Sequence, residues 1–372
     1  MAKSLRKKAK RSPLVVSIVG ARPQFVKLAP LASAYNTLSF NKHFRHKIYH
    51  SGQHYNTDMS DVFFSELNIP QPDLNLAVGS GSHGEMTAEM LRAFETKFKQ
   101  ARPAMIIVYG DTNTTLAGTL AAVKMNIPVA HIEAGLRSFD LTMPEEINRR
   151  MTDHVSALLF APTVAAVKNL KKENVPGEIV RSGDLMYELL HNLQPYLEQN
   201  LATLNRFGVQ SGAFVLFTAH RPATVDACET LERLLALLAE LKMPVIFPAH
   251  PRTIKSLKRH KLIGSLKKLK HVQVCQPLPY LDNLTLAHHS ALVVTDSGGL
   301  QKEAVFQGVK CLTMRNETEW PETFRYNNHL IGLSVKSLRA ARKAPLVKKT
   351  MQWKIGGQPP SEIILQTISD RL

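Results

Sequence analysis

The chain has 372 residues, of which 44% are hydrophobic and 21% are charged. This composition is ordinary for a soluble globular protein, and the length allows two domains because single cores stop growing near ~250–300 residues. The formal net charge of +17 is unusual, and part of it lies in the basic stretch "MAKSLRKKAKR". That stretch can bind nucleic acid or an anionic membrane, or it can simply be a solvated, disordered arm, and an anionic small-molecule substrate would suit the same charge.

Several other classes are excluded by what the sequence lacks. Its three cysteines have no metal-ligand spacing, which favours a reducing, cytoplasmic compartment over a disulfide or zinc framework. No apolar stretch approaches the roughly 18 residues of a membrane span, and no signal-peptide cleavage pattern follows the first apolar run. The basic runs lack aromatic interleaving, so no specific nucleic-acid partner is expected. Residues 1–12 are predicted to form a basic, disordered tail.

The recurring unit is a short apolar run, a polar or glycine-rich turn and an amphipathic stretch. Runs of Val, Ile, Leu and Ala without alternation are typical of parallel strands buried on both faces. They occur in "LVVSIVGARPQ", "AMIIVYGDTN", "PVAHIEAGLR", "FVLFTAHRP", "PVIFPAHPRT" and "ALVVTDSGGLQ". Alternation with helices predicts an α/β fold of two Rossmann-like, doubly wound domains that face each other across a cleft.

The predicted boundary between the domains lies near "VPGEIVRSGDLMYE". We expect an N-terminal domain over 13–182 and a C-terminal domain over 183–357. A last helix, expected within 358–372, is able to pack back on the N-terminal domain.

The polar residues that follow the first-half runs are candidate ligand contacts, because ligands bind outside the carboxyl ends of parallel strands. Arg22 and Lys27 lie around a predicted helix N-terminus, where they can hold an anion or remain a solvated cap. Asp111 can act in chemistry or as an N-cap. For Glu133 capping is a weaker explanation, because Gly135 follows too soon for a clear helix start. Glu145 opens a predicted helix and can simply complement its dipole.

The second half offers a candidate phosphate site. Ser297, Gly298 and Gly299 follow a strand and open a helix, whose free N–H groups and dipole favour an anion. A tight turn with an N-cap is the alternative. Glu303 lies two turns further and can accept hydrogen bonds from ribose hydroxyls. His220, next to Arg221 at a strand end, can donate to phosphate or carry a proton.

Eight blocks of the chain, in order, resemble those of the non-hydrolysing UDP-N-acetylglucosamine 2-epimerases. They are "GARPQFVKLAP", "SGQHYNTDM", "VYGDTNTTLAG", "PVAHIEAGLRS", "MPEEINRRMTDH", "TAHRP", "TDSGGLQKEA" and "MRNETEWPE". The resemblance runs from about residue 14 to residue 325. Any one block is a weak signal, whereas eight in order are specific.

The resemblance implies the GT-B fold, with the nucleotide held mainly by the C-terminal domain. It implies an isomerase of polysaccharide biosynthesis that interconverts UDP-GlcNAc and UDP-ManNAc as a homodimer, without a metal or other cofactor. Such enzymes eliminate UDP across C1–C2 to give 2-acetamidoglucal, then add UDP back with the proton on the opposite face. By motif position, the implied catalytic set is Asp111, Glu133, Glu145 and His220. The implied UDP-sugar contacts are Arg22, Lys27, His220, Ser297, Gly298, Gly299 and Glu303.

The sequence departs from the best-known bacterial members. Trp320 stands where those enzymes have an arginine near the ligand, and Asn283 where they have a phenylalanine near the uracil. Gln53 and His54 keep part of an allosteric block that lacks its arginine here. The segments "GARPQF", "SHGEMT", "RSGDLMYE" and "TEW" resemble the branch that includes UDP-2,3-diacetamido-2,3-dideoxyglucuronate 2-epimerases, so this modified sugar is an alternative substrate. A GT-B glycosyltransferase and a hydrolysing epimerase are further alternatives; the three N-terminal carboxylates favour the non-hydrolysing epimerase.

Overall fold

The computed structural model describes residues 12–52, 57–79, 81–347 and 354–372. The tail predicted for residues 1–12 lies outside these ranges except for Ser12, and so do Gln53 and His54. The chain divides into two compact units between Leu185 and Met186, and residues 354–372 belong to the first unit.

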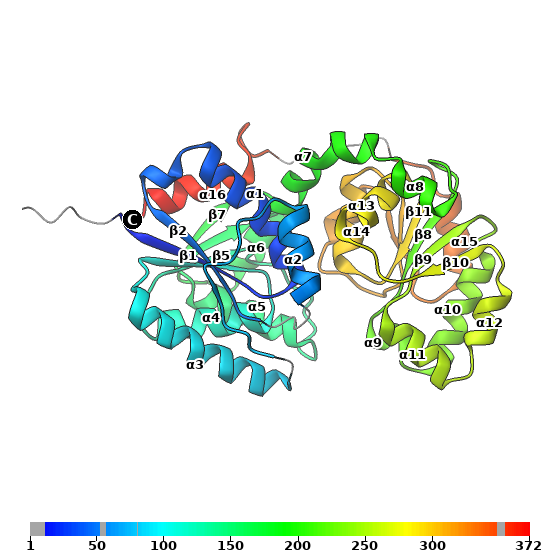
Figure 1. The fold of residues 1–372 in the computed structure, drawn as a ribbon, viewed down its shortest axis with the longest axis horizontal. Helices are drawn as coiled ribbons and strands as arrows, with labels where there is room; N and C mark the ends of the chain where they lie inside the picture. Colours follow the sequence, from blue (N-terminus) through cyan, green and yellow to red (C-terminus); the bar gives the residue numbers. More distant parts are fainter. Residues whose placement is uncertain (1–11, 53–56, 80, 348–353) are drawn as a thin grey trace, which may run out of the picture. The chain divides into compact units, whose positions relative to one another are not determined.

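The first unit is built on a seven-stranded parallel sheet with the strand order β3-β2-β1-β4-β5-β6-β7. In that order the strands are Leu74–Asn75, Arg45–His50, Leu14–Val19, Met105–Tyr109, Val129–Ile132, Leu158–Ala161 and Glu178–Arg181. Its helices are α1 (Arg22–Thr37), η1 (Phe40–Lys42), α2 (Thr57–Glu66), α3 (His83–Ala101), α4 (Asn113–Val123), α5 (Pro144–Val155), α6 (Val164–Lys172) and α16 (Pro360–Ser369). Helices α3, α4 and α5 pack in sequence, and α16 packs against α1 (Figure 1).

The second unit is built on a six-stranded parallel sheet with the order β10-β9-β8-β11-β12-β13. In that order the strands are Val272–Cys275, Val245–Pro248, Val215–Thr218, Leu292–Thr295, Cys311–Thr313 and Asn328–Leu330. Its helices are α7 (Leu185–Gln199), α8 (Ala202–Phe207), α9 (Pro222–Val225), α10 (Cys228–Glu240), α11 (Pro251–Arg259), α12 (Ile263–Lys268), α13 (Tyr280–His289), α14 (Gly298–Phe306), η2 (Pro321–Arg325) and α15 (Val335–Lys343).

The non-alternating apolar runs make strands that are buried on both faces. In β8, Val215 and Phe217 belong to one hydrophobic core and Leu216 belongs to another. Successive side chains of a strand point to opposite faces, so each face of this sheet needs its own layer of helices. The α/β class predicted from the sequence is confirmed in both units.

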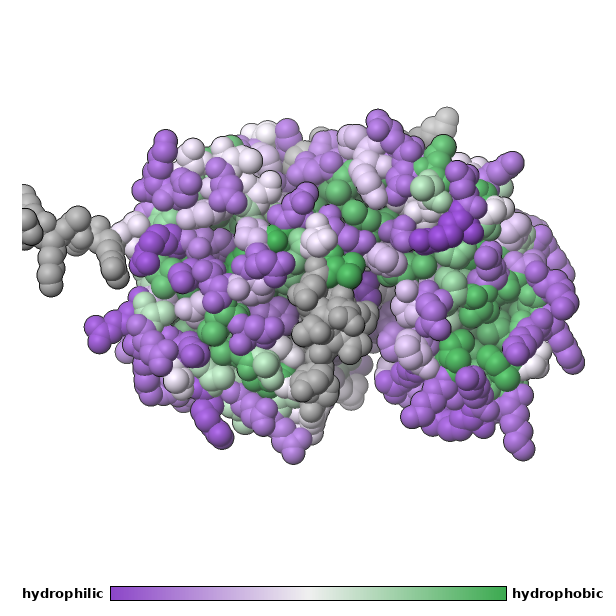
Figure 2. Space-filling model, in the orientation of Figure 1, coloured by the Kyte–Doolittle hydropathy of each residue, from purple (hydrophilic) through white to green (hydrophobic). Residues whose placement is uncertain are grey.

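Apolar side chains reach the surface in both units. Helical spacing relates Ile147, Met151, Val155 and Leu158, but α5 ends at Val155, and Leu158 begins β6. The first three of these side chains are exposed, at 44%, 42% and 41%, so this apolar stripe does not face the core. In the space-filling view, apolar side chains also gather between hydrophilic ones on the visible face of the second unit (Figure 2).

No helix among the described residues combines the length and the apolar character needed to cross a membrane. The thiols of Cys228, Cys275 and Cys311 are all free.

Candidate active site

In the first unit two carboxylates meet at the carboxyl edge of the sheet. Strands β4 and β5 are parallel neighbours with Tyr109 opposite Ile132, so the residues that follow them share one edge. Glu133 has a left-handed backbone (φ 71°), and its carboxylate forms an ion pair with the Lys27 ammonium group. Both side chains are nearly buried. A Cβ at Gly110 would lie 3.3 Å from both charged groups, so glycine at this position leaves room for the pair.

Asp111 completes this acidic pair and is not the N-cap of α4. That cap is Thr112, whose hydroxyl accepts a hydrogen bond from the Thr115 N–H. The Asp111 carboxylate instead lies 2.7 Å from Arg149 Nη2. Burial raises the pKa of Asp111 above its usual value and the negative charge of Glu133 adds to the rise, while Arg149 and Lys27 oppose it. Two carboxylates and two cations therefore form one electrostatic cluster.

Helix α5 positions Arg149 and the loop before it. The buried carboxylate of Glu146 accepts hydrogen bonds from the Ser138 N–H at 2.9 Å and from Arg149 Nη1 at 2.6 Å. Asn148 donates to the Asp111 carbonyl oxygen at 2.9 Å. Glu145 is exposed in the first turn, three and four residues before these two contacts. Its side chain therefore starts one helical turn away from the groups that touch Asp111.

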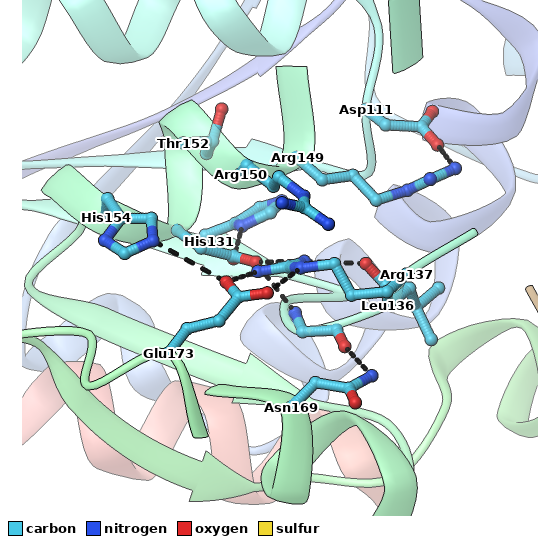
Figure 3. Close-up of polar contacts among 12 residues, drawn as sticks. Asp111, His131, Leu136, Arg137, Arg149, Arg150, Thr152, His154, Asn169 and Glu173 are labelled. Atoms are coloured by element: carbon cyan, nitrogen blue, oxygen red, sulfur yellow. Dashed lines mark hydrogen bonds and ion pairs between the residues drawn. The ribbon is translucent and has the colours of Figure 1, made fainter. Parts of the chain in front are cut away.

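A buried network behind the strand ends holds this cluster in place (Figure 3). His131 of β5 lies with Nδ1 2.7 Å from Asp153 Oδ1 and Nε2 2.7 Å from the Gly110 carbonyl oxygen. Both partners are hydrogen-bond acceptors, so the ring bridges the Asp153 carboxylate and the backbone before Asp111. Arg137 Nη1 lies 2.7 Å from Asp153 Oδ2. Burial alone would raise the pKa of Asp153, but His131 and Arg137 hold it below its usual value.

Of the two basic residues predicted around α1, Lys27 pairs with Glu133, as described above. Arg22 lies at the start of the helix, half-buried, with its guanidinium carbon 4.8 Å from the ring centre of Phe63. Its planar group is therefore held by stacking on an aromatic ring.

In the second unit the predicted phosphate loop forms the N-terminus of α14. The Ser297 hydroxyl accepts from the Leu300 N–H, so Ser297 is the N-cap. Within the described ranges, the N–H groups of Gly298 and Gly299 meet no acceptor in the protein. They are the donors that a helix start leaves for an anion.

Asp296, which sequence reasoning missed, fixes the turn that carries His220. Its fully buried carboxylate accepts from the backbone N–H groups of His220 at 2.9 Å and Arg221 at 2.8 Å, and lies 3.2 Å from His220 Nδ1. Burial favours the neutral acid, but these donors hold the pKa of Asp296 below its usual value. The His220 side chain remains 43% exposed, so a ligand can still reach the ring.

Glu303 and Trp320, two further residues singled out in this unit, are both buried. The Tyr280 hydroxyl donates to Glu303 Oε1 at 2.9 Å, so Tyr280 orients this carboxylate. Trp320 is 6% exposed, and Lys302 Nζ lies 3.5 Å from its ring centre. Trp320, which stands where the best-known bacterial members have an arginine, therefore packs on Lys302.

Several contributing residues were not selected from the sequence, among them His131, Arg149 and Asp296. All three lie inside quoted motifs, within four residues of a residue that was selected. Their distant partners lie 21 to 76 residues away along the chain, so only the fold shows what they hold. Two cavities of the second unit, of about 620 and 420 Å³, are lined by none of the predicted site residues.

Paired carboxylates at one strand edge and an anion-accepting helix start, on two parallel α/β sheets, define an enzyme of the GT-B class. The profile of the family described as UDP-N-acetylglucosamine 2-epimerase matches residues 36–354. The chain belongs to the UDP-N-acetylglucosamine 2-epimerase family.

Three relatives illustrate the similarity. A UDP-N-acetylglucosamine 2-epimerase homolog of Methanococcus maripaludis is 46% identical over 310 residues, covering 83% of this chain and 85% of its own. The UDP-2,3-diacetamido-2,3-dideoxy-D-glucuronate 2-epimerase of Pseudomonas aeruginosa is 41% identical over 362 residues, covering 94% and 98%. The crystal structure of Methanocaldococcus jannaschii UDP-GlcNAc 2-epimerase in complex with UDP-GlcNAc and UDP matches with a TM-score of 0.85 at 38% identity, covering 96% and 99%.

Proposed function

We propose that the chain interconverts UDP-GlcNAc and UDP-ManNAc by inverting C2 of the sugar. The C2–H bond is not adjacent to a carbonyl group, so its proton leaves only with a leaving group on C1. A carboxylate takes the C2 proton, the C1–O bond breaks, and its electron pair departs with UDP. The sugar is left as 2-acetamidoglucal, with a double bond between C1 and C2. Return of UDP to C1 and of a proton to the opposite face of C2 completes the inversion.

The observation that carries this proposal is the cluster of Asp111 and Glu133 with Lys27 and Arg149. Inversion needs two proton carriers, one for each face of C2. Glu133, whose carboxylate pairs with the Lys27 ammonium group, is proposed to accept a proton. The raised pKa of Asp111 suits it to hold and return one. Glu145, one turn before Arg149 in sequence, is proposed as the third member of the catalytic set.

The second unit supplies the leaving-group site in this proposal. The free N–H groups of Gly298 and Gly299 stabilise charge that develops on the departing diphosphate, and His220 donates to the same group. One such donor is typically worth about 10²–10³ in kcat. Glu303, oriented by Tyr280, accepts from the ribose hydroxyls. In the first unit, Arg22 contacts the diphosphate.

A second substrate is favoured by one specific observation. The Pseudomonas aeruginosa relative is aligned over 98% of its length, and its name gives a sugar with a carboxylate and two acetamido groups. The formal net charge of +17 suits such a sugar as well. We therefore propose UDP-2,3-diacetamido-2,3-dideoxyglucuronate as the alternative substrate of the same reaction.

Proton exchange in D2O tests the reaction and separates the substrates. We expect deuterium to enter C2 of UDP-GlcNAc and a UDP-ManNAc pool to build up without added acceptor. Exchange only with the diacetamido uronate would transfer the assignment to the alternative. Turnover only with an acceptor would indicate a glycosyltransferase, and release of free ManNAc a hydrolysing epimerase.

The role of the carboxylates is tested with Glu133→Gln. We expect exchange to fall at least about 10³-fold while UDP still binds, because the leaving-group site is intact. Glu95→Gln, on the exposed surface of α3, is the matched control and should retain exchange. Normal exchange in Glu133→Gln would remove this residue from the mechanism.

We also propose that the chain works as a homodimer. The exposed stripe of Ile147, Met151 and Val155 on α5 supports this, because a row of three apolar side chains on one helix face favours a protein contact over water. Light scattering should give a dimeric mass for the wild type and a monomeric mass for Met151→Glu. Leu38→Glu, another exposed apolar position of the first unit, should remain dimeric; a monomeric wild type would contradict the proposal.

A further inference from the structure

The guanidinium group of Arg315 lies beside the start of α14. Strands β11 and β12 are parallel neighbours with Thr295 opposite Thr313, so Arg315 and the Ser297–Gly299 loop leave the sheet at the same edge. Arg315 is 8% exposed. A Cβ at Gly298 would lie only 3.4 Å from its Nη1 atom. The arginine therefore borders the backbone N–H groups that the protein leaves free.

The two outer nitrogens of Arg315 are used differently. Nη2 lies 2.9 Å from Glu319 Oε2. Nη1 is buried and, among the residues that the structure describes, has no hydrogen-bond partner. A buried donor without an acceptor is costly, and more so when it carries charge. Such a donor is expected where a ligand supplies the missing acceptor.

The carboxylate group of Glu319 also lies next to the Ser297–Gly299 loop. Its Oε1 atom would lie 2.9 Å from a Cβ at Gly298. Burial alone would raise the pKa of Glu319, but the charges of Arg315 and Arg221 hold it below its usual value. An ionised carboxylate therefore stands beside the positive end of the α14 dipole, where an anion is favoured. A bound diphosphate would repel it unless a cation lies between the two.

We propose that Arg315 is a further diphosphate-binding residue, which gives Nη1 to the phosphate and keeps Nη2 on Glu319. Glu319 is then a positioning residue: it aims the guanidinium plane at the loop, and its negative charge weakens the hold on UDP. This inference rests on the proposed function, because it takes the α14 start as the diphosphate site. The planar fork of arginine suits the bridge, whereas the single ammonium group of lysine does not.

The test compares UDP with uridine, which has no phosphate. Calorimetry should show that Arg315→Met weakens UDP binding about 10- to 100-fold, which is the effect of losing one charged hydrogen bond. Uridine affinity, measured by NMR titration, should stay unchanged. Arg315→Lys should lose less UDP affinity than Arg315→Met. Arg325→Met removes an exposed charge from the same unit and should bind UDP normally.

Glu319→Gln tests the second half of the proposal. The amide keeps an oxygen beside Nη2 but the negative charge is gone, so UDP should bind at least as tightly as in the wild type. Weaker UDP binding in this variant would contradict the proposal that the negative charge of Glu319 opposes the ligand. Equal loss of UDP and uridine in Arg315→Met would indicate a purely structural arginine and overturn the inference.

The outcomes separate this inference from the function on which it rests. If the wild type exchanges the C2 proton but Arg315→Met binds UDP normally, the inference fails and the function stands. If Arg315→Met loses UDP selectively but no UDP-sugar is exchanged by the wild type, the arginine site stands and the epimerase proposal fails.

Discussion

Asp111 and Asp296 both follow parallel strands, yet the protein shifts their pKa values in opposite directions. Burial raises the pKa of Asp111, because the cations around it do not compensate fully. Burial acts on Asp296 as well, but the His220 ring and two backbone N–H donors outweigh it. One carboxylate is thus kept ready to hold a proton, and the other is kept charged as a structural anchor.

This contrast predicts opposite stability changes for the two amide variants at pH 7. A carboxyl group with a raised folded pKa costs stability once the pH exceeds its unfolded value of about 4, so Asp111→Asn should raise the melting temperature while exchange is lost. A lowered folded pKa stabilises above about pH 4, and this contribution is lost as the pH falls through the folded value, so Asp296→Asn should melt lower. Shifts of about 2–4 °C per kcal/mol are expected in calorimetry. Shifts of the same sign would contradict the argument.

Asp153 has a larger structural role, because its buried carboxylate contacts both the His131 ring and the Arg137 guanidinium, which also pairs with Glu173. Asp153→Asn removes the buried carboxylate that Arg137 and His131 share, and it should destabilise the first unit by about 3–5 kcal/mol at pH 7 in urea unfolding. Since the pKa of Asp153 is lowered, the difference from the wild type should shrink as the pH falls below about 4. Asp140→Asn, an exposed carboxylate in the same unit, should change stability far less.

At the scale of elements, the apolar runs could be located from the sequence because burial on both faces removes polar residues from a strand. The strands β1, β4, β5, β8, β9 and β11 all lie in such runs. The two-residue β3 and the half-exposed edge strands β7 and β10 have no comparable signal. The exposed stripe on α5 is the opposite case, because its sequence signal is clear but does not give its burial. Helical spacing of apolar residues does not say which face the core covers.

The loop after β5 depends on a glycine that packs against another element. Gly135 has a positive φ of 81°, and a Cβ there would lie 2.5 Å from the Ala166 carbonyl oxygen of α6. Gly135→Ala should cost about 2–5 kcal/mol, from backbone strain and overpacking together. Gly308→Ala is the matched control, with φ of 76° and no atom within 4 Å of the added carbon. It should cost only about 1–2 kcal/mol in thermal unfolding. Equal costs would show that packing against α6 is unimportant.

At the scale of the whole molecule, the sequence leads to the family and to residues that follow strands, but not to the charges that hold them. Glu133 could be selected because capping explains it poorly, whereas its partner Lys27 was selected for a different reason, as an anion contact. Arg315 and Glu319 lie within one quoted block, yet their position beside Gly298 depends on the pairing of β11 with β12. Tertiary pairing of charges leaves no local pattern.

The distribution of charge leads to a prediction for the intact chain. Residues 1–12 contain six Lys and Arg residues and no acidic residue, so deleting them lowers the formal net charge from +17 to +11. No predicted site residue lies in this segment, so the deletion should leave kcat within about twofold, a change of under 0.5 kcal/mol in barrier. The remaining positive charge should still attract the anionic UDP-sugar. Between about 20 and 300 mM salt, KM should therefore rise in both proteins, because the Debye length falls below about 10 Å. Loss of turnover in the shortened chain would instead assign residues 1–12 a part in the reaction, and a KM independent of salt would show that the net charge does not guide the substrate.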